Sequence, residues 1–305
     1  MTIPRRIFVS TACIKEAEPL MARLSSYRNA GLDAIELGMC VHVDQGDLSG
    51  LAVMDTQFLV HNYFPPPGEP FIINLASADP GIRQRSLDLA KHAIILTREL
   101  NAPFYAIHAG FVTDPCGFGD PYFLFPELTV TDVRKKAFER YINALSIINQ
   151  YAIEHEVGLL IENNVCAPEM RGQVLLDRPD EFSELFEKIN SSNSGILLDF
   201  GHLNVAAHTL GFDRLDFIKQ LTPYIRSFHV HDNDGTFDTH SPVQPGSWVL
   251  EVLRRPEFAD LPLVVEAKFD DVTSLSQHVD WLRGELSVIM DKDKNADKSE
   301  NPQRG

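Results

Sequence analysis

The segment FHVHDNDGTFDTH, at positions 228–240, gathers side chains that can bind a metal ion. It holds three histidines and three aspartates directly after the stretch YIRSF. Asp and Asn are depleted in strands, and like charges placed close together repel one another. That repulsion must be offset, either by water around an exposed loop or by a metal ion on which these groups converge.

Six consecutive apolar segments end in the same kinds of side chain. In chain order, the first three segments end in His61, His108 and Glu162. The fourth ends in Asp199, with His202 three residues on. The fifth carries His229 and His231, with Asp238 and His240 in the loop that follows, and the sixth ends in Glu266. A single histidine at the end of a strand is more often a hydrogen-bonded structural residue. Six such segments in succession instead favour a common binding site. Neutral imidazole and carboxylate are ligands of Zn²⁺, Mn²⁺, Fe²⁺ and Co²⁺. There are more groups than one ion coordinates, so they suit either two or three ions, or one ion with the remaining groups binding substrate.

The elements that must position these residues alternate between strand and helix. Continuous apolar, β-prone runs lie at 6–11, 34–38, 58–61, 104–108, 158–162, 195–199, 225–231 and 261–266, and helical spacing of apolar residues recurs at 18–30, 83–100, 133–155 and 180–191. Continuous apolar runs are typical of parallel strands buried on both faces. Eight such strands alternating with helices predict an α/β fold, a (β/α)₈ TIM barrel. The alternative is an open doubly wound sheet. The sequence does not support it, because no glycine-rich GxGxxG turn follows the first strand.

A barrel places the ends of its strands at one mouth, where barrel enzymes keep their chemistry. The proline-rich loop 62–70 and the long aromatic loop 110–127 follow strands, so we expect both at that mouth. Positions 1–290 are predicted to form a single barrel domain, and the polar positions 291–305 a disordered tail.

Charge and cysteine content restrict the class of protein. The 305-residue chain carries a formal net charge of −16, which argues against binding nucleic acid, because that depends on Lys and Arg at the phosphates. The four cysteines, Cys13, Cys40, Cys116 and Cys166, are widely spaced without a CxxC pair, as expected in a reducing cytoplasm. No apolar run has the length of a membrane span, and we expect no signal peptide.

An ordered set of motifs gives a resemblance to a known superfamily. The motifs are VHNYFPPPGEPFIINLAS (60–77), AIHAG (106–110), LLIENN (159–164), LLDFGHLN (197–204), FHVHDNDGTFDTHSPVQPG (228–246) and VVEAKF (264–269). With barrel spacing over residues 5–285, the chain resembles the xylose-isomerase-like TIM barrels. That superfamily joins sugar (phosphate) isomerases and epimerases with apurinic endonucleases of the endonuclease IV type.

The resemblance implies two alternative metal sites. The endonuclease pattern, with three zinc ions, is similar to His61, His108, Glu162, Asp199, His202, His229, Asp238, His240 and Glu266. The epimerase pattern uses Glu162, Asp199, His229 and Glu266 around one divalent ion. In that pattern Glu162 and Glu266 are catalytic: one removes a proton beside a carbonyl and the other returns it, through an enediolate. The implied cofactor is therefore one to three ions of Zn, Mn, Co or Mg.

We accordingly expect a cytoplasmic, metal-dependent isomerase or epimerase acting on a sugar or sugar-like compound, with His231, Lys268 and Arg171 binding substrate. The alternative is a trinuclear-zinc phosphodiesterase, and a third reading is a sugar-binding barrel without catalysis. Two features depart from the family patterns: the loop from His229 to Asp238 is short for a DNA-repair enzyme, and DNDGT stands where some epimerases have an arginine. We expect a small carbohydrate-like partner, no nucleic acid and no membrane; the oligomeric state stays open, a homo-oligomer included.

Overall fold

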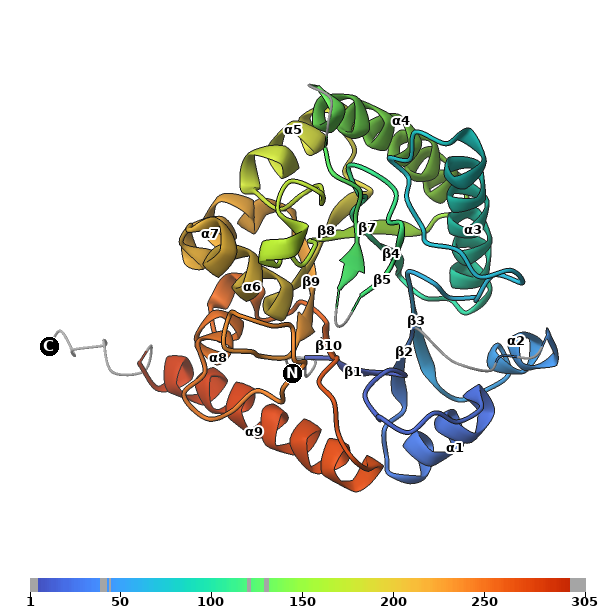
Figure 1. Ribbon diagram of the computed structural model, residues 1–305. Coiled ribbons are helices and arrows are strands. Elements are labelled where there is room, and N and C mark those ends of the chain that lie inside the picture. Colours follow the sequence, from blue (N-terminus) through green and yellow to red (C-terminus); the bar gives the residue numbers. More distant parts are fainter. Residues whose placement is uncertain (1–4, 39–42, 44, 120–121, 129–131, 297–305) are drawn as a thin grey trace, which may run out of the picture.

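Eight parallel strands close into a barrel in the computed structural model, which describes residues 5–38, 43, 45–119, 122–128 and 132–296 (Figure 1). The strands are β1 (Ile7–Ser10), β2 (Ala34–Leu37), β3 (Gln57–His61), β4 (Phe104–His108), β7 (Gly158–Glu162), β8 (Ser194–Asp199), β9 (Ile225–Val230) and β10 (Leu263–Val265). Around the barrel their order is β1, β10, β9, β8, β7, β4, β3, β2. Each strand falls within or overlaps one predicted range, and the predicted (β/α)₈ barrel is confirmed.

Helices surround the barrel on its outside (Figure 1). They are α1 (Leu20–Asn29), α2 (Gln45–Leu51), α3 (Pro80–Glu99), α4 (Val133–Glu154), α5 (Pro179–Ile189), α6 (Phe200–Leu210), α7 (Arg214–Leu221), α8 (Trp248–Leu253) and α9 (Val272–Ala296). The four predicted helical patterns correspond to α1, α3, α4 and α5. Within the described ranges, no helix has the length and apolar character needed to cross a membrane.

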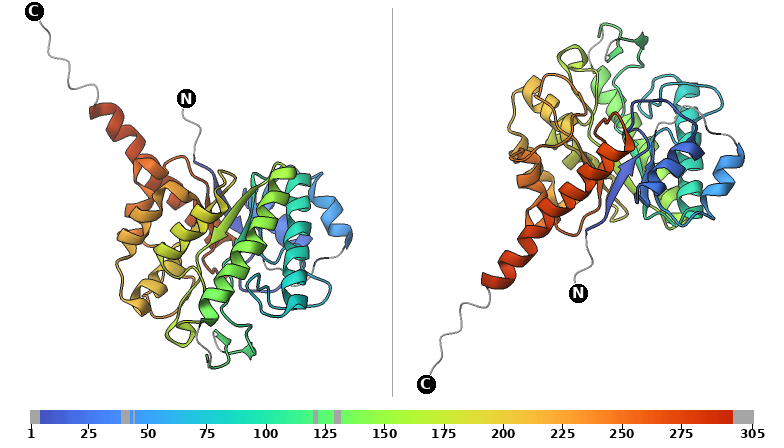
Figure 2. Two further views of the ribbon diagram at one scale, coloured as in Figure 1. Left: turned by 90° about the horizontal axis from the view of Figure 1, so that it is seen from above. Right: turned by 90° about the horizontal axis from the view of Figure 1, so that it is seen from below.

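The C-terminal helix α9 extends beyond the rest of the fold (Figure 2). It contains positions 291–296, which the sequence analysis assigned to a disordered tail. The rest of that predicted tail, 297–305, lies outside the described residues, as does Cys40.

The strands separate two apolar regions, because successive side chains point to opposite faces. One set packs outward against the helices, as Val9, Tyr105 and Leu198 do within the large core. The other set fills the barrel interior and consists of Phe8, Leu59, Phe104, Ala106, Leu160, Leu197 and Val264. Two positions further along the strands, the inward side chains become polar, as from Leu160 to Glu162. The inner apolar cluster therefore forms a floor beneath the polar mouth of the barrel.

The aromatic loop 110–127 folds partly into a small hairpin, β5 (Gly117–Phe118) with β6 (Phe123–Leu124). The ring of Phe111 packs against Phe123 and Phe125 at centroid distances of 5.6 and 5.4 Å. These rings join a buried apolar cluster, whereas Phe118 is 77% exposed. Part of the loop thus forms a local core, and its tip presents an aromatic side chain to solvent.

Candidate metal centre

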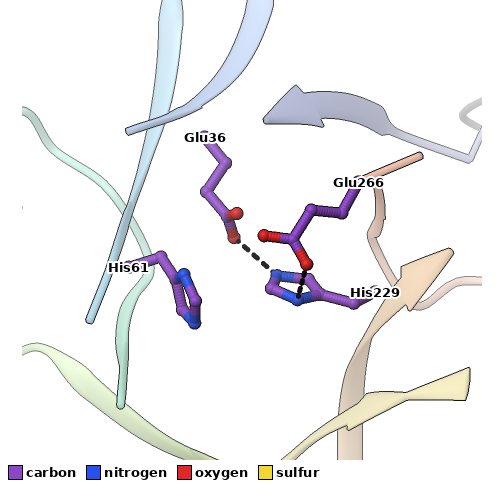
Figure 3. Close-up of side chains that lie close together, drawn as sticks. All are labelled: Glu36, His61, His229 and Glu266. Carbon is purple, nitrogen blue, oxygen red and sulfur yellow. Dashed lines mark hydrogen bonds and ion pairs between the residues drawn. The ribbon is translucent and has the colours of Figure 1, made fainter. Parts of the chain in front are cut away.

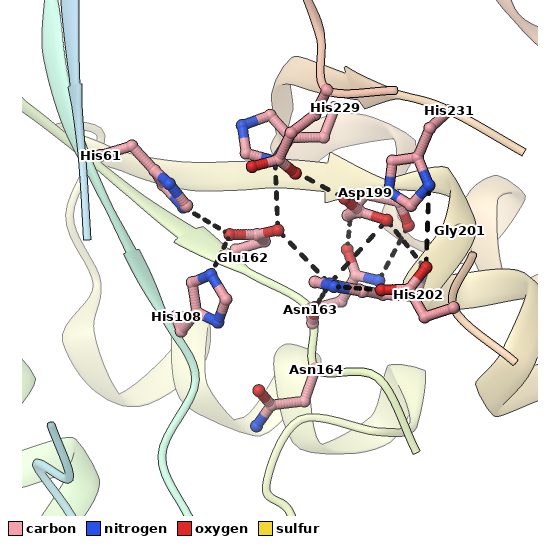
Figure 4. Close-up of polar contacts among 12 residues, drawn as sticks. His61, His108, Glu162, Asn163, Asn164, Asp199, Gly201, His202, His229 and His231 are labelled. Carbon is pink, nitrogen blue, oxygen red and sulfur yellow. Dashed lines mark hydrogen bonds and ion pairs between the residues drawn. The ribbon is translucent and has the colours of Figure 1, made fainter. Parts of the chain in front are cut away.

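The polar side chains predicted from the strand ends converge at one end of the barrel (Figure 4). The structure brings together His61, His108, Glu162, Asp199, His202, His229, His231, Asp238, His240 and Glu266 through a continuous set of contacts. Most of them are buried, and the side chain of His108 is the most open, at 35% exposed. The spatial grouping that the sequence analysis expected is therefore present.

Glu162, the last residue of β7, is the central carboxylate. Its Oε2 atom lies 2.7 Å from Nε2 of His61 and 3.0 Å from Nε2 of His108. Its Oε1 atom lies 3.3 Å from Nδ1 of His202 and 3.2 Å from Nδ1 of His229. Burial alone would raise the pKa of Glu162, but His108, His229 and His61 hold that pKa well below its usual range. Glu162 is therefore an ionised carboxylate whose two oxygens face two different pairs of imidazoles.

His229 of β9 lies at the centre of a second group of contacts, which also includes Asp199 and Glu266. Its Nδ1 atom lies 3.1 Å from Oε2 of Glu266 and 3.5 Å from Oδ2 of Asp199. Glu162, Asp199, His229 and Glu266 each offer one ligand atom, and these four atoms lie within 4.8 Å of one another. This group is the four-residue set that the epimerase resemblance implied.

Asp199 is fixed by the change from strand to helix. It is the last residue of β8 and the N-cap of α6, where its Oδ1 atom accepts a hydrogen bond of 2.7 Å from the backbone N–H of His202. Asn163 accepts from the backbone N–H of Asp199 and donates to its carbonyl, at 2.8 and 3.0 Å. A carboxylate at a helix N-terminus is also stabilised by the helix dipole. The Asp199 Oδ2 atom is thus directed at the other candidate ligands.

A third group forms around Asp238, in the loop after β9. Its Oδ2 atom lies 3.3 Å from Nε2 of His202 and 3.2 Å from Nε2 of His240. The Nδ1 atom of His202 lies 2.9 Å from the carbonyl of Asn163, and that of His240 lies 3.2 Å from the carbonyl of Glu266. Each ring therefore donates its Nδ1–H to a backbone carbonyl and directs its Nε2 atom into the site, the orientation that metal-binding histidines have.

His231, predicted to bind substrate, lies inside this third group. Its Nε2 atom is 2.9 Å from Oδ2 of Asp199, and its ring stacks on His240 at a centroid distance of 4.2 Å. It is fully buried, and with Asp238 and His240 it forms a group able to hold a metal ion. Gly201 makes room for this ring, since a Cβ atom there would lie 2.0 Å from Cε1 of His231. The predicted contact of His231 with substrate stays a prediction.

The side chains of the two predicted basic residues donate hydrogen bonds to backbone carbonyls. Lys268 donates from Nζ to the carbonyl of Ala12 at 2.7 Å. Arg171 donates to the carbonyl of Thr209, in the last turn of α6. Their assignment to a substrate carboxylate or phosphate stays a prediction.

Glu36, on β2, is a residue of the centre that was not predicted from the sequence. This residue is fully buried, and its Oε2 atom lies 3.0 Å from Nε2 of His229 (Figure 3). The signal was a carboxylate inside the apolar run AIEL, at an inward position. Glu36 lies one residue before the end of its strand, and the polar residues that close β3, β4, β7 and β8 give a plainer pattern.

Several buried atoms in the centre lack a hydrogen-bond partner within the described part of the chain. They are Oε1 of Glu36, Oε1 of Glu162, Nδ1 of His229 and Nδ1 of His231. Leaving a buried polar atom unpaired costs about 1–3 kcal/mol. The donors are imidazole nitrogens and carboxylate oxygens, which are the ligands that divalent transition-metal ions prefer. The residues present therefore fit a divalent metal ion.

The imidazoles hold protons where a cation would lie. Burial alone would lower the pKa of His229, but Glu36 and Glu266 raise that pKa well above its usual value. The pKa of His202 is raised likewise, by Asp199 and Asp238 against burial. Because coordination needs neutral imidazole, these protons and a metal ion compete for the same atoms.

A family comparison identifies the architecture around this centre. Residues 27–285 match the family model described as "Xylose isomerase-like TIM barrel". The chain belongs to this family. The match covers all of the candidate ligands and every barrel strand except β1.

Curated relatives of the chain include members with different activities in their names. It is 25% identical over 213 residues to "Probable endonuclease 4" of Thermoplasma acidophilum, which covers 66% of each chain. It is 23% identical over 262 residues to "Fructoselysine 3-epimerase" of Shigella flexneri, covering 80% of this chain and 82% of that one. The crystal structure of a "D-tagatose 3-epimerase-like protein" superposes with a TM-score of 0.74 at 20% identity, over 94% of this chain and 99% of that one. This last similarity shows the shared fold.

Proposed function

We propose that this protein is a divalent-metal-dependent isomerase or epimerase of a sugar or sugar-like polyhydroxy carbonyl compound. The observation that carries the proposal is the group of Glu162, Asp199, His229 and Glu266, whose ligand atoms lie within 4.8 Å of one another. Glu162 and Glu266 flank Nδ1 of His229 at 3.2 and 3.1 Å. The similarity to the fructoselysine epimerase supports this choice within the family.

The two glutamates would move the proton. A divalent ion in this group would polarise the carbonyl and hydroxyl oxygens of the substrate. Glu162 and Glu266 are ionised, since the imidazolium of His229 contributes to lowering both of their pKa values against the effect of burial. One carboxylate removes the proton from the carbon beside the carbonyl, which gives the enediolate of the substrate, and the other returns a proton to it. His61 and His108 hold Glu162 in place for that transfer.

The apolar floor and the burial of the site exclude bulk water from the place where the substrate would react. Leu160 and Val264 lie two positions before Glu162 and Glu266 on the same strands and are buried in the inner cluster. Glu162 is fully buried, whereas the Glu266 side chain is 13% exposed. Water exclusion strengthens electrostatic stabilisation of an enediolate and limits its side reactions.

The second candidate is hydrolysis of a phosphodiester, and the third ligand group favours it. His202, Asp238 and His240, together with His61 and His108, provide ligands beyond those that one ion uses. Clustered ions suit the activation of water and the neutralisation of a leaving oxygen. The net charge of −16 opposes binding to duplex DNA, so we expect no nicking of an abasic duplex by zinc-loaded protein at low salt. Nicking well above that of Glu162→Gln would move the assignment to the hydrolase.

Exchange with solvent tests the isomerase directly. The metal-loaded protein is incubated with a panel of ketoses and aldoses in D₂O, and deuterium in the recovered sugars is measured by mass spectrometry. We expect deuterium at the carbon beside the carbonyl for at least one sugar, and loss of that exchange in Glu162→Gln and Glu266→Gln. Glu181→Gln is the matched control, because Glu181 is a largely buried carboxylate bound by Arg134 on the outer helices. Exchange that persists in both site variants would refute the proposed roles.

A further inference from the structure

Glu36 reaches the metal centre from the far side of the barrel interior. It lies on β2, whereas its partner His229 lies on β9, and β1 and β10 separate these strands in the closed sheet. Both side chains are fully buried, and Oε2 of Glu36 lies 3.0 Å from Nε2 of His229. Figure 3 shows Glu36 and Glu266 linked to different nitrogens of the same ring. The contact therefore crosses the interior and is made by side chains alone.

The two nitrogens of His229 have unequal surroundings. Nδ1 faces three carboxylates: Glu266 at 3.1 Å, Glu162 at 3.2 Å and Asp199 at 3.5 Å. Nε2 faces Glu36. A cation shared by three carboxylates and one imidazole belongs on the Nδ1 side. The lone pair of Nδ1 must then be free, so the ring proton is carried by Nε2 and donated to Glu36.

A direct bond from Glu36 to the metal is the competing arrangement. Glu36, His61, His229 and Glu266 also offer ligand atoms within 4.8 Å of one another. In that arrangement His229 would bind the ion through Nε2. Its Nδ1 atom would then lie among three carboxylates with no metal ion between them to offset their mutual repulsion. Without a cation between them, the opposite ring tautomer would also set the Nε2 lone pair against the Glu36 oxygen. The arrangement with the proton on Nε2 satisfies both sides of the ring.

The charge of Glu36 is directed at His229. Among the described residues, His229 is the one cationic side chain in direct ion-pair contact with it, although its charge also acts on His61, and its Oε1 atom has no hydrogen-bond partner there. A buried carboxylate with so few partners is a strong acceptor for the ring N–H. Carboxylates that accept the remaining N–H of a metal-binding histidine fix its tautomer and raise its basicity as a ligand.

We propose that Glu36 is a positioning residue, which holds His229 with Nδ1 turned toward Glu162, Asp199 and Glu266. This inference rests on the proposed metal-dependent function. Glu36 acts through His229 and does not itself touch the substrate. Loss of such a partner lowers metal affinity by about 10–100-fold.

The test measures metal affinity rather than turnover. Wild-type protein, Glu36→Gln, Glu36→Ala and the control Glu181→Gln are stripped of metal, and the Kd for Co²⁺ is measured by competition with a chelator. We expect Kd to rise about 10–100-fold in Glu36→Ala. The rise should be smaller in Glu36→Gln, because an amide oxygen still accepts the N–H but carries no charge. The Co²⁺ absorption spectrum should shift in both Glu36 variants and match wild type in Glu181→Gln.

A second measurement needs no variant, so it holds even if the Glu36 variants do not fold. NMR of zinc-loaded wild-type protein with ¹⁵N-labelled histidine rings should show His229 protonated at Nε2 and coordinated through Nδ1. Coordination through Nε2 overturns the proposal. Wild-type Kd and spectrum in folded Glu36→Ala and Glu36→Gln also overturn it, while leaving the metal centre intact. If the wild type binds no divalent ion, the proposed function fails together with this inference.

Discussion

Nδ1 of His229 and Oε1 of Glu162 lie 3.2 Å apart, and in the described part of the chain neither buried atom has a hydrogen-bond partner. They come from β9 and β7, which both pair with β8, so the register of the barrel sets this approach. Two buried ligand atoms that face each other without a hydrogen bond carry an energetic cost, of which their ion pair offsets a part. A cation bound by both atoms would remove that cost, and this is the basis of the metal-centre assignment.

Glu266→Gln keeps the size of the side chain and removes its charge. Glu266 Oε2 lies 3.1 Å from Nδ1 of His229, within the four-residue group. We expect metal affinity to fall by about tenfold or more, with sugar isomerisation lost and the circular dichroism spectrum unchanged. Full activity and full metal content in this variant would contradict the assignment.

Metal-induced stabilisation should grow with pH. His202 and His229 have pKa values raised above the unfolded value of about 6.5, so their protons stabilise the metal-free fold fully below that pH. That contribution is lost as pH rises through the folded pKa values, and metal binding no longer has to displace the protons. The carboxylates have lowered pKa values, so their contribution is lost in acid and is constant across this window.

The measurement is the rise in Tm on adding Mn²⁺ or Zn²⁺ to stripped protein. It should be larger at about pH 8.5 than at about pH 6, because fewer ring protons compete at the higher pH. A metal-induced rise that is equal at both values, or larger at the lower one, is incompatible with the histidine assignment.

Gly201→Ala tests the packing of His231. The new Cβ atom would lie 2.0 Å from Cε1 of His231, so the ring must leave its place beside Asp199 and His240. We expect a loss of about 1–3 kcal/mol in the free energy of unfolding, measured by urea denaturation, and a weaker third ligand group. Gly284→Ala, on the exposed side of α9 with nothing within 4 Å, is the control and should be stabilising or neutral. Equal effects of the two substitutions would show that the Gly201 site is not constrained.

Two aromatic residues of the 110–127 loop should behave differently. The Tyr122 hydroxyl accepts a hydrogen bond of 2.9 Å from the backbone N–H of Asp238, whereas Phe118 is 77% exposed. Tyr122→Phe should weaken metal binding in the Asp238 group by loosening its loop, at about 0.5–1.5 kcal/mol. Phe118→Ala should raise KM without changing metal content, if the exposed ring lines the path of the substrate. Metal titration and steady-state kinetics distinguish these outcomes, and a loop that affects neither quantity is purely structural.

Strand ends were the most predictable part of the site. His61, His108, Glu162 and Asp199 close continuous apolar runs, and parallel strands bring their last residues to one mouth. Glu36 was not predicted because its contact with His229 crosses the barrel, and the run AIEL shows only an acidic residue among apolar ones.

Three further features could not be predicted from the sequence, each for a physical reason. The two-residue strands β5 and β6 are too short to carry a periodic pattern. The polar composition after position 290 predicts a tail, yet α9 continues to Ala296. The room left by Gly201 for His231 depends on two segments that meet only in the folded barrel.

Elemental analysis of native protein, purified without added metal or chelator, tests the central claim most directly. We predict about one Mn, Co or Mg ion per chain, held in the group of Glu162, Asp199, His229 and Glu266. About three zinc ions per chain would favour the phosphodiesterase instead. Protein that contains no divalent metal and binds none when it is supplied would contradict the account.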